Sequence, residues 1–362
     1  MKKSMRSPSL AALAAFILSV PACAQTCTGD IVQDGRVDGG DLGTLLANWG
    51  PVTTTTVSRA CDLNGDGRVD GADLGMALVN WGACPTIVPA WATLLEPYPS
   101  SAVVADPALR AAISASGLAW RVRDTATQIE MVLIPPGSFD MGCTPSDQQA
   151  CLNDERPVHR VILTNAFYLG RFEVTQAQWQ ARTGSNPSTF QSATAEVPSS
   201  QVSSRPVERV TWSAVQGFLS GTGMRLPTEA EWEYAYRAGT ATAFHGYPGN
   251  VAGTNDDSLA TNIGWFAVNA SGQTHPVGGK AANGFGLHDM AGNVYEWVSD
   301  WLGAYPSTTQ TNPVGPASGT YRALRGGSWV GNTLYIRGSF RNYGVMPGNS
   351  TVDLGFRVAR DP

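Results

Sequence analysis

The sequence is poor in charge, and neither sign of charge dominates it. Charged residues make up 15% of the 362 residues and the formal net charge is −5, whereas typical soluble domains are about a quarter charged. Because binding to phosphates needs a surplus of lysine and arginine, the composition gives no support for a nucleic-acid partner. The 40 glycines, 23 prolines and 11 tryptophans exclude a collagen or a coiled coil and indicate a turn-rich globular protein.

Long apolar runs are also scarce, and the one candidate lies at the N-terminus. A basic start, Lys2 to Arg6, precedes the apolar run Leu10–Val20, which is too short for a stable membrane span. With the small residues up to Ala24, these features predict a signal peptide over residues 1–24 and export to the medium or the cell surface. The alternative, a buried N-terminal helix, explains neither the basic start nor the cleavage residues. No other stretch has the length of a transmembrane segment.

A lipid anchor is a second interpretation of the same segment. Val20-Pro21-Ala22-Cys23 loosely resembles a lipobox, which would place the lipid on Cys23. Pro21 disfavours this interpretation. Cleavage of the signal peptide would remove three basic residues and take the net charge from −5 to about −8 (−5 − 3).

Cysteine is absent beyond Cys151. Five cysteines would remain after cleavage, and in an oxidising compartment they are expected to pair rather than to hold a metal, since none has zinc-type spacing. Cys143 and Cys151 bracket a short polar loop and are the expected disulfide. Cys27, Cys61 and Cys84 allow three pairings, and each pairing leaves one thiol over.

A repeat with a period of 32 residues fills the N-terminal region. Each copy is an acidic, glycine-rich loop followed by a helical pattern that ends in Asn-Trp-Gly. In the second copy, oxygen ligands stand at positions 1, 3, 5, 7, 9 and 12 and glycine stands at position 6, which is the spacing of a calcium loop. These candidate ligands are Asp62, Asn64, Asp66, the backbone carbonyl of Arg68, Asp70 and Asp73.

The first copy is a weaker candidate for calcium. Its ligands would be Asp30, Asp34, the backbone carbonyl of Arg36, Asp38 and Asp41. Val32 replaces the oxygen ligand at the third position, so we expect this site to bind calcium weakly or to be empty. For both loops the alternative is an acidic turn without a metal.

The paired loops resemble a type I dockerin module over residues 27–84. Asp73 at the twelfth position reaches less far than glutamate and fits that family better than calmodulin-type loops. The resemblance implies a small all-α, EF-hand-like module that binds calcium and docks onto a cohesin-like partner. Residues 85–118 are rich in proline, alanine and serine and are expected to be a linker with one short helix starting at Asp106.

Residues 119–362 form the second expected domain. Strands are expected around Met131–Gly142, within Val161–Glu173, near Arg322–Leu324 and in Gly355–Ala359. Capping boxes place the starts of short helices at Thr175, Ser213 and Thr228. On the last helix we interpret Glu229, Glu231 and Glu233 as helix capping and surface charge rather than as an acid–base pair.

Several sequence blocks of this domain stand in a fixed order. Among them are Glu155-Arg-Pro-Val-His159, Arg225-Leu-Pro-Thr-Glu-Ala-Glu-Trp232, Asn283-Gly-Phe-Gly-Leu-His-Asp-Met-Ala-Gly-Asn293 and Arg325-Gly-Gly-Ser-Trp329. They resemble the formylglycine-generating (sulfatase-modifying factor) family over about Ile129–Arg360. The resemblance implies an α/β (α+β) domain of C-type-lectin-like fold, with little regular secondary structure and with structural calcium.

The resemblance places a structural calcium site on one loop. Its ligands would be Asp289, Gly292, Val294 and Glu296. Two carboxylates and two backbone carbonyls suit a hard cation. The alternative is that Asp289 caps a turn while Glu296 pairs with an arginine. A second family site would start at Asn262 and Ile263, but the segment that should complete it is shortened in this chain.

The resemblance does not extend to the catalytic residues. Members that oxidise a substrate cysteine to formylglycine hold copper with two cysteines after the Gly-Gly-Ser motif, and these positions are Gly331 and Ile336 here. Neither side chain can bind copper, which needs soft thiolates. The four histidines form no local pair for iron, and His159 and His288 are expected to be hydrogen-bonded framework residues. We therefore expect calcium, but neither copper nor iron.

Two functions remain open. The first is a noncatalytic recognition domain, tethered by the dockerin-like module, that binds an unknown peptide or other ligand in a groove. The groove residues would be Ser328, Trp329, Arg337 and Arg341. The second is a metal-dependent oxidase or oxygenase of the same superfamily, acting on a protein or a small thiol through a metal site that the sequence does not reveal.

Overall fold

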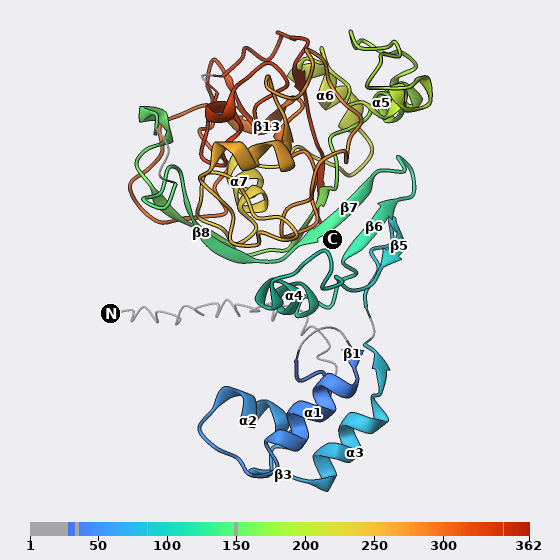
Figure 1. Ribbon diagram of the computed structural model, residues 1–362, viewed down its shortest axis with the longest axis vertical. Coiled ribbons are helices and arrows are strands. Elements are labelled where there is room, and N and C mark those ends of the chain that lie inside the picture. Colours follow the sequence, from blue (N-terminus) through green and yellow to red (C-terminus); the bar gives the residue numbers. More distant parts are fainter. Residues whose placement is uncertain (1–27, 33–35, 85, 148–150, 343) are drawn as a thin grey trace, which may run out of the picture.

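The computed structural model describes residues 28–32, 36–84, 86–147, 151–342 and 344–362. The signal peptide expected over residues 1–24, together with Cys27 and Asp34, lies outside these residues. A small hydrophobic cluster lies in the N-terminal region, and a large one extends over the rest of the chain. Figure 1 shows the N-terminal helices as a body apart from the larger domain. Within the described part of the chain, no helix is long and apolar enough to cross a membrane.

The N-terminal region consists of short helices and very short strands. These are β1 (Arg36–Val37), α1 (Gly39–Ala47), β2 (Gly50–Pro51), α2 (Thr56–Cys61), β3 (Arg68–Val69), α3 (Gly71–Val79) and β4 (Gly82–Ala83). Strand β1 pairs with β4 and β2 pairs with β3, so the region is not purely helical. Helices α1 and α3 follow the two acidic loops and begin with equivalent capping boxes, on Asp38 and Asp70. The sequence repeat therefore folds as a structural repeat.

The segment expected to be a linker, residues 85–118, is folded onto the larger domain. Strand β5 (Ala92–Glu96) pairs antiparallel with β6 (Arg121–Asp124). Helix α4 (Pro107–Ser114) begins after the N-cap Asp106, as expected. Trp91 and Ile113 pack in the large hydrophobic cluster. The average composition of this segment is that of a linker. Its structure depends instead on a few large apolar side chains, since the burial of each stabilises the fold by about 1.5–3 kcal/mol.

Three sheets form the framework of the larger domain. The five-stranded sheet has the order β17-β10-β7-β6-β5, with β7 (Glu130–Ile134), β10 (Phe167–Gly170) and β17 (Ala359–Arg360). The second sheet has the order β14-β9-β8, with β8 (Gly137–Met141), β9 (His159–Leu163) and β14 (Gln310–Thr311). The third has the order β15-β13-β16, with β13 (Tyr295–Trp301), β15 (Arg322–Arg325) and β16 (Leu354–Gly355). A further pair joins β11 (Gly264–Trp265) to β12 (Ala291–Gly292).

Besides the expected strands, the larger domain contains strands that the sequence analysis did not predict, which are β5, β6, β11, β12, β13 and β14. The expected strands around residues 131–142, 161–173 and 322–324 are present, and the expected strand over 355–359 is split into β16 and β17. The longest of the strands that were not predicted is β13. Its alternating apolar residues, Tyr295, Trp297 and the adjacent Val298, are buried, and they were hidden by the glycine- and asparagine-rich segments on either side.

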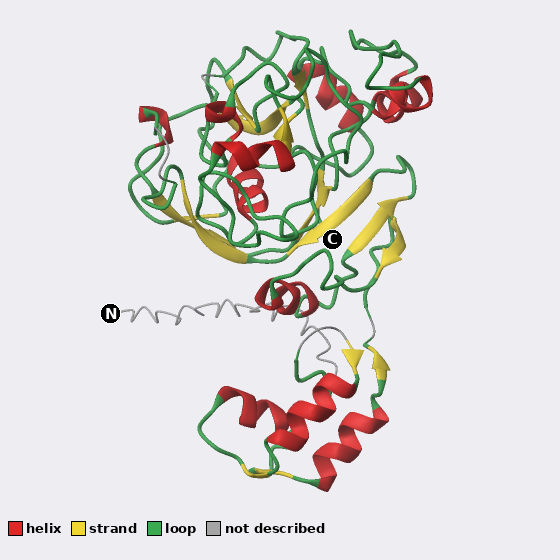
Figure 2. Ribbon diagram, viewed as in Figure 1, coloured by secondary structure: helices red, strands yellow, loops and turns green. Residues whose placement is uncertain are grey.

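Short helices and long loops complete the domain. The α-helices are α5 (Gln176–Thr183), α6 (Trp212–Leu219) and α7 (Glu229–Arg237), and the 3-10 helices are η1 (Asn153–Glu155), η2 (Ser199–Ser204), η3 (Asp257–Asn262) and η4 (Thr333–Ile336). Capping boxes on Thr175 and Thr228 start α5 and α7 as expected, whereas α6 starts after Thr211 rather than at Ser213. Figure 2 shows how much of this domain is loop, as expected for a domain with little regular structure.

Helix α7 lies in the interior of the domain (Figure 1), so two of its glutamates are buried. Glu233 pairs with Arg237 at 2.8 Å and with Arg325 at 2.5 Å. Glu229 pairs with another arginine, as described below. The interpretation of these two residues as surface charge was therefore wrong. Glu231 does cap the helix, since its carboxylate accepts the amide of Thr228 at 2.8 Å.

We expect Glu233→Gln to destabilise the larger domain strongly. The substitution leaves Arg237 buried without its counter-charge and leaves Arg325 with only the longer pair to Glu229, at 3.4 Å. Loss of one partner of a buried ion pair typically costs about 3–5 kcal/mol of unfolding free energy. Urea denaturation of the full chain measures this loss. The matched control is Asp140→Asn, which breaks the exposed pair with Arg160 and should change stability by only about 0–1 kcal/mol. Equal effects of the two substitutions would contradict a supporting role for the buried pair.

Candidate functional site

Of the two positions that hold copper in the family, Gly331 lies just before η4 and Ile336 lies at its end. Ile336, the last residue of η4, is fully buried. A Cβ atom at Gly331 would lie 3.0 Å from the ring of Tyr335, so the space of a ligand side chain is partly taken. Of the described cysteines, Cys84, Cys143 and Cys151 are in disulfides. The residues at this site do not fit copper.

The remaining cysteine of the described residues is buried in the N-terminal region. Cys61 is the free thiol, and its Sγ donates a hydrogen bond to the carbonyl oxygen of Thr44 at 3.7 Å. Burial, and then the carboxylate of Asp73, raise the pKa of this thiol. It is therefore an inert structural group rather than a metal ligand. The disulfide between Cys143 and Cys151 is the one expected from the sequence.

The four residues expected to form one binding groove have separate roles. Ser328 is buried, and its hydroxyl donates to the carboxylate of Asp353 at 3.1 Å. The indole of Trp329 packs edge-on against Phe190, with ring centroids 5.3 Å apart, and donates to the carbonyl of Val352 at 3.3 Å. These contacts hold the loop that follows β15 in place.

Both arginines of the expected groove are buried in ion pairs. Arg337 donates two hydrogen bonds to Glu155, at 2.6 and 3.0 Å. Arg341 likewise donates two hydrogen bonds to Glu229, at 2.6 and 2.7 Å, and its guanidinium lies over the ring of Tyr305. A buried guanidinium needs a carboxylate to offset its desolvation. Arg337 is therefore structural and is not available to a ligand, which corrects the sequence-based expectation.

Three buried carboxylates surround the loop on which the family binds calcium. Glu296 pairs with Arg357 at 2.5 Å and accepts the indole N–H of Trp232 at 2.7 Å. Asp289 accepts the amide of Gly278 at 2.6 Å through Oδ2. The pairing of Glu296 with an arginine is the alternative that the sequence left open. Even so, Oδ1 of Asp289 is buried and has no hydrogen-bond partner among the described residues.

The third carboxylate, Glu173, was not recognised as a site residue from the sequence. It accepts the amide of Val294 at 3.0 Å and the side chain of Asn293 at 2.7 Å. Burial, and then the neighbouring carboxylates of Asp289 and Glu296, raise its pKa well above the usual range. Burial likewise raises the pKa of Asp289 to about 6. No local sequence signal marks Glu173, because it meets this loop only through the fold.

The charges of this cluster fit a bound cation. The carboxylates of Glu173, Asp289 and Glu296 face the single guanidinium of Arg357, and an additional positive ion would offset the excess. The backbone is also suited to a close approach at Gly292, where φ is +82° and a Cβ atom would lie 2.1 Å from the carbonyl oxygen of Trp265. Calcium, bound by Asp289 and the carbonyls of Gly292 and Val294, would be held by oxygen ligands that it prefers.

The second expected calcium position has a different environment. The carbonyl of Asn262 accepts the amide of Ala281 at 3.0 Å, and its side chain donates to the hydroxyl of Tyr247 at 3.2 Å. Ile263 is buried. The backbone carbonyl and the side-chain N–H of Asn262 are therefore engaged within the protein.

The second N-terminal loop is organised around backbone amides. Asp62 accepts the amides of Asp66 and Gly67, at 3.1 and 2.9 Å. Asp73 is fully buried and accepts the amides of Leu63 and Asp70, at 2.7 and 2.8 Å. No three carboxylates of this loop bring their oxygens within 4.8 Å of one another. The loop is thus closed by backbone amides that donate hydrogen bonds to the carboxylates expected to bind calcium.

The first loop repeats the same anchor. Asp41 is fully buried and accepts the amides of Ile31 and Asp38, at 2.6 and 2.8 Å. It therefore takes the place that Asp73 has in the second loop. Val32, which replaces an oxygen ligand, is 42% exposed, so its side chain does not fill the interior of the loop.

The four histidines are held individually by backbone carbonyls. The ring nitrogens of His159, His245, His275 and His288 lie 2.8–3.2 Å from carbonyl oxygens. Burial lowers the pKa of His245 and of His288 to about 4. Among the described residues, no histidine belongs to a group that could share a metal. This arrangement confirms that His159 and His288 are hydrogen-bonded and does not fit iron.

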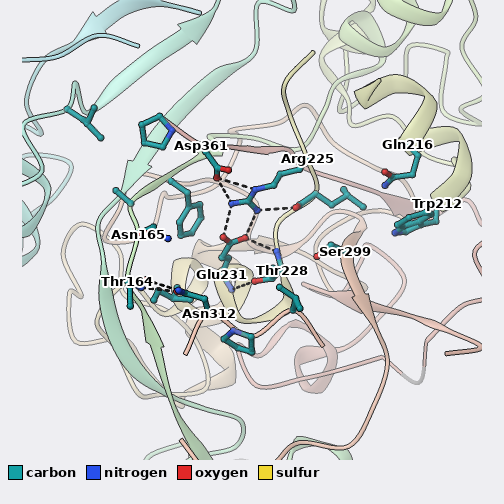
Figure 3. Close-up of a pocket in the computed structure, with 18 residues that line it drawn as sticks. Thr164, Asn165, Trp212, Gln216, Arg225, Thr228, Glu231, Ser299, Asn312 and Asp361 are labelled. Atoms are coloured by element: carbon teal, nitrogen blue, oxygen red, sulfur yellow. Dashed lines mark hydrogen bonds and ion pairs between the residues drawn. The ribbon is translucent and has the colours of Figure 1, made fainter. Parts of the chain in front are cut away.

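Two cavities flank the start of α7, and the sequence contains no signal for either. The larger has a volume of about 980 Å³. Figure 3 shows that Arg225 crosses it, between Glu231 of α7 and Asp361 near the C-terminus, with Trp212 and Gln216 of α6 to one side. The charges on its wall are paired with one another. The smaller cavity, of about 400 Å³, lies beyond residues 312–314, which line both.

Comparison with known proteins agrees with both sequence resemblances. A family model of the sulfatase-modifying factor enzyme 1-like domain matches residues 120–362, and one of the dockerin type I domain matches residues 28–77. The chain is 31% identical over 283 residues to the formylglycine-generating enzyme of Bos taurus, covering 64% of this chain and 75% of that protein. It is 36% identical over 251 residues to the serine/threonine-protein kinase pkn1 of Chlamydia caviae, covering 64% of this chain but only 38% of that protein's length.

Solved structures share the mixed α/β fold of the larger domain. Treponema denticola variable protein 1 matches with a TM-score of 0.55 and 32% identity, over 65% of this chain and 95% of that one. PvdO from Pseudomonas aeruginosa matches with a TM-score of 0.53 and 29% identity, over 67% and 98%. The chain therefore belongs to the family of sulfatase-modifying factor enzyme 1-like domains, here preceded by a dockerin type I domain.

Proposed function

We propose that this protein is an exported, calcium-binding recognition protein whose larger domain binds a ligand without oxidising it. The observation that carries the proposal is the pair Gly331 and Ile336 at the copper positions of the family. Because function resides in the residues of a site rather than in the fold that carries it, likeness to a formylglycine-generating enzyme does not transfer that activity. The kinase name of the pkn1 relative is not transferred either, since this chain spans only 38% of its length.

The structure supports this proposal by showing what the remaining residues do. The free thiol of the described residues, Cys61, is buried in the N-terminal region, and no histidine cluster is present among these residues to replace the copper ligands. The surrounding framework is kept intact by ion pairs, as at Arg337 with Glu155. A domain with its framework retained and its redox ligands replaced is suited to binding.

The protein should not convert a cysteine-containing sulfatase peptide to formylglycine. Oxidation replaces the thiol by an aldehyde, a loss of about 18 Da, so mass spectrometry after incubation with copper, a thiol reductant and oxygen tests the proposal directly. We expect no such product, because neither Gly331 nor Ile336 offers a soft donor. Steady turnover to the aldehyde would refute the noncatalytic function.

The double variant Gly331→Cys/Ile336→Cys tests whether the ligands alone are missing. It should gain copper(I) binding, provided that Tyr335 shifts away from position 331, and some oxidation of the peptide would then support the assignment of the copper positions. The matched control is Gly331→Ser/Ile336→Ser, which has the same shape but lacks sulfur and should gain neither property.

The dockerin region is proposed to tether the protein to a cohesin-like partner outside the cell. Dockerin type I domains are generally calcium-binding, and the second loop retains an oxygen side chain or carbonyl at every ligand position. The carboxylate of Asp62 accepts the amides of Asp66 and Gly67, and that of Asp66 accepts the amide of Arg68. Bound calcium would take the place of these amides as the partner of the two carboxylates. The family implies a C-type-lectin-like fold for the larger domain. We take this fold to be compatible with a binding role outside the cell.

The second loop should be the tighter of the two N-terminal calcium sites. We expect Asp62→Ala/Asp66→Ala to abolish one tight site in equilibrium dialysis of the full chain, since it removes two of the charged ligands. The matched control is Asp30→Ala in the first loop, where Val32 already weakens binding, and it should leave the tight site intact. An unchanged calcium stoichiometry in the double variant would overturn the assignment.

Calcium should also stabilise the larger domain independently of the N-terminal loops. The test uses the Asp62→Ala/Asp66→Ala variant, which lacks the tight N-terminal site. Calcium at about 100 times its dissociation constant should raise the free energy of unfolding by about 2.7 kcal/mol. This corresponds to a rise of several degrees in the melting temperature. Asp289→Asn should remove this rise, whereas Asp140→Asn should keep it. Calorimetric scans with calcium and with chelator measure it, and identical melting temperatures in the two would show that Asp289 holds no calcium.

A further inference from the structure

The smaller cavity beside α7 contains a carboxylate that is not paired with a cation. Ser299 lines the larger cavity and Asp300, the next residue of β13, lines the smaller one, because successive side chains of a strand point to opposite faces. Figure 3 shows Ser299 and Asn312 among the residues that line the larger cavity, and Asn312 also lines the smaller one. The carboxylate of Asp300 thus faces the second cavity, in a residue that is only 4% exposed.

Only one oxygen of Asp300 is used by the protein. Oδ2 accepts the amide of Glu229 at 2.9 Å and the hydroxyl of Ser299 at 2.8 Å. Oδ1 has no hydrogen-bond partner among the described residues, and none of their arginines or lysines comes within 4.0 Å of it. A buried carboxylate is costly without a counter-ion, so the cavity offers a favourable place for a cation.

The other charges around the cavity are already compensated. Arg341 is held in two hydrogen bonds by Glu229, and its remaining donors bind the carbonyls of Asp154 and Gly303 at 3.1 and 2.9 Å. His159 has a buried ring that is held at 3.2 Å from the carbonyl of Pro157. The unbalanced charge at the cavity is therefore that of Asp300.

The rest of the wall is partly apolar, with Gln310 and Asn312 as neutral polar groups. The apolar lining residues are Met141, Trp301, Pro306, Pro313, Val314 and Pro316. At about 400 Å³, the cavity has the size of a small-molecule site, in which apolar walls supply contact area and a few polar groups set orientation. One carboxylate in apolar walls is complementary to a methylene chain that ends in a positive charge.

We propose that this cavity binds an alkylammonium group, with the ammonium on Asp300 and the methylene chain against the apolar walls. A free amine and a lysine side chain share this chemistry. The proposal goes beyond the proposed function and does not depend on it, because the cavity is lined by neither Gly331 nor Ile336.

Titration of Asp300 gives the proposal a second, independent signature. Burial raises the pKa of Asp300 to about 7, with a further contribution from Glu229. The groups that act on it are Glu229 and Glu231 of α7, Ser299 of β13 and Arg322 of β15, while Arg341 and His159 line the same cavity. A carboxyl with a raised pKa is neutral below pH 7 and charged above it, while an alkylammonium stays charged at both. Affinity should therefore rise about tenfold between pH 6 and pH 8.

The test is titration of the full chain with n-butylammonium, followed by calorimetry and by the indole N–H signals of the tryptophans. We expect Asp300→Asn to weaken binding at least tenfold while retaining an oxygen that accepts the Glu229 amide. The matched control is Asp361→Asn, which removes the same charge at the exposed rim of the larger cavity and should change affinity less than twofold. The neutral analogue n-butanol should bind at least tenfold more weakly than the ammonium.

A second probe, Nα-acetyl-lysine N-methylamide, separates the two sources of the ligand. If it binds like n-butylammonium, the cavity accepts a lysine side chain, and if only n-butylammonium binds, the ligand is a free amine. Binding that is unaffected by Asp300→Asn, or that falls as the pH rises from 6 to 8, would overturn the proposal. If the variant does not fold, the pH series on the unmodified chain decides alone. Neither outcome of the amine titration changes what is expected in the formylglycine assay. One of the two proposals can therefore be refuted while the other stands.

Discussion

Arginine–carboxylate pairs that are closed off from water hold the larger domain together. Glu233–Arg325, Glu155–Arg337 and Glu296–Arg357 are fully buried, and their partners are 92, 182 and 61 residues apart in the sequence. The domain has short strands and long loops, so few ladder hydrogen bonds are available to connect its segments. Each pair joins two segments that are distant in the sequence, and the Glu155–Arg337 and Glu296–Arg357 pairs do so through two hydrogen bonds in a defined geometry. Removal of one partner is costly because the other charge stays buried.

This constraint also decides which charged residues are left for ligands. Arg337 and Arg341 stand in the segment where a family cleft is expected, yet their guanidinium groups are taken up by Glu155 and Glu229. Carboxylates outnumber their cations in two places. One is the cluster of Glu173 and Asp289 with the Glu296–Arg357 pair, and the other is Asp300 in the smaller cavity. Both are places where an additional cation gains electrostatic energy, and they are the positions on which the calcium and alkylammonium proposals rest.

The chain keeps the family scaffold around two copper positions that carry Gly331 and Ile336. Trp329, Ser328 and Gly327 keep the turn after β15, and Gly327 lies so close to Tyr335 and Ile336 that a side chain at position 327 would collide with them. Of the two copper positions, Ile336 belongs to the large hydrophobic cluster, and its side chain and that of Tyr335 fill the space there.

Features that depend on near neighbours were determined by the sequence. The loop repeat, the capping boxes on Thr175 and Thr228 and the Cys143–Cys151 disulfide arise within a turn or one short loop, so local spacing was enough to predict them. The order of the blocks was also enough to indicate the family. Interactions across the fold were decided only by the tertiary structure. The burial of Glu229 and Glu233, the docking of β5 onto β6 and the meeting of Glu173 with Asp289 join residues far apart in the chain. No local pattern encodes such contacts, because a charged side chain has the same sequence signature whether it meets water or an arginine in the core.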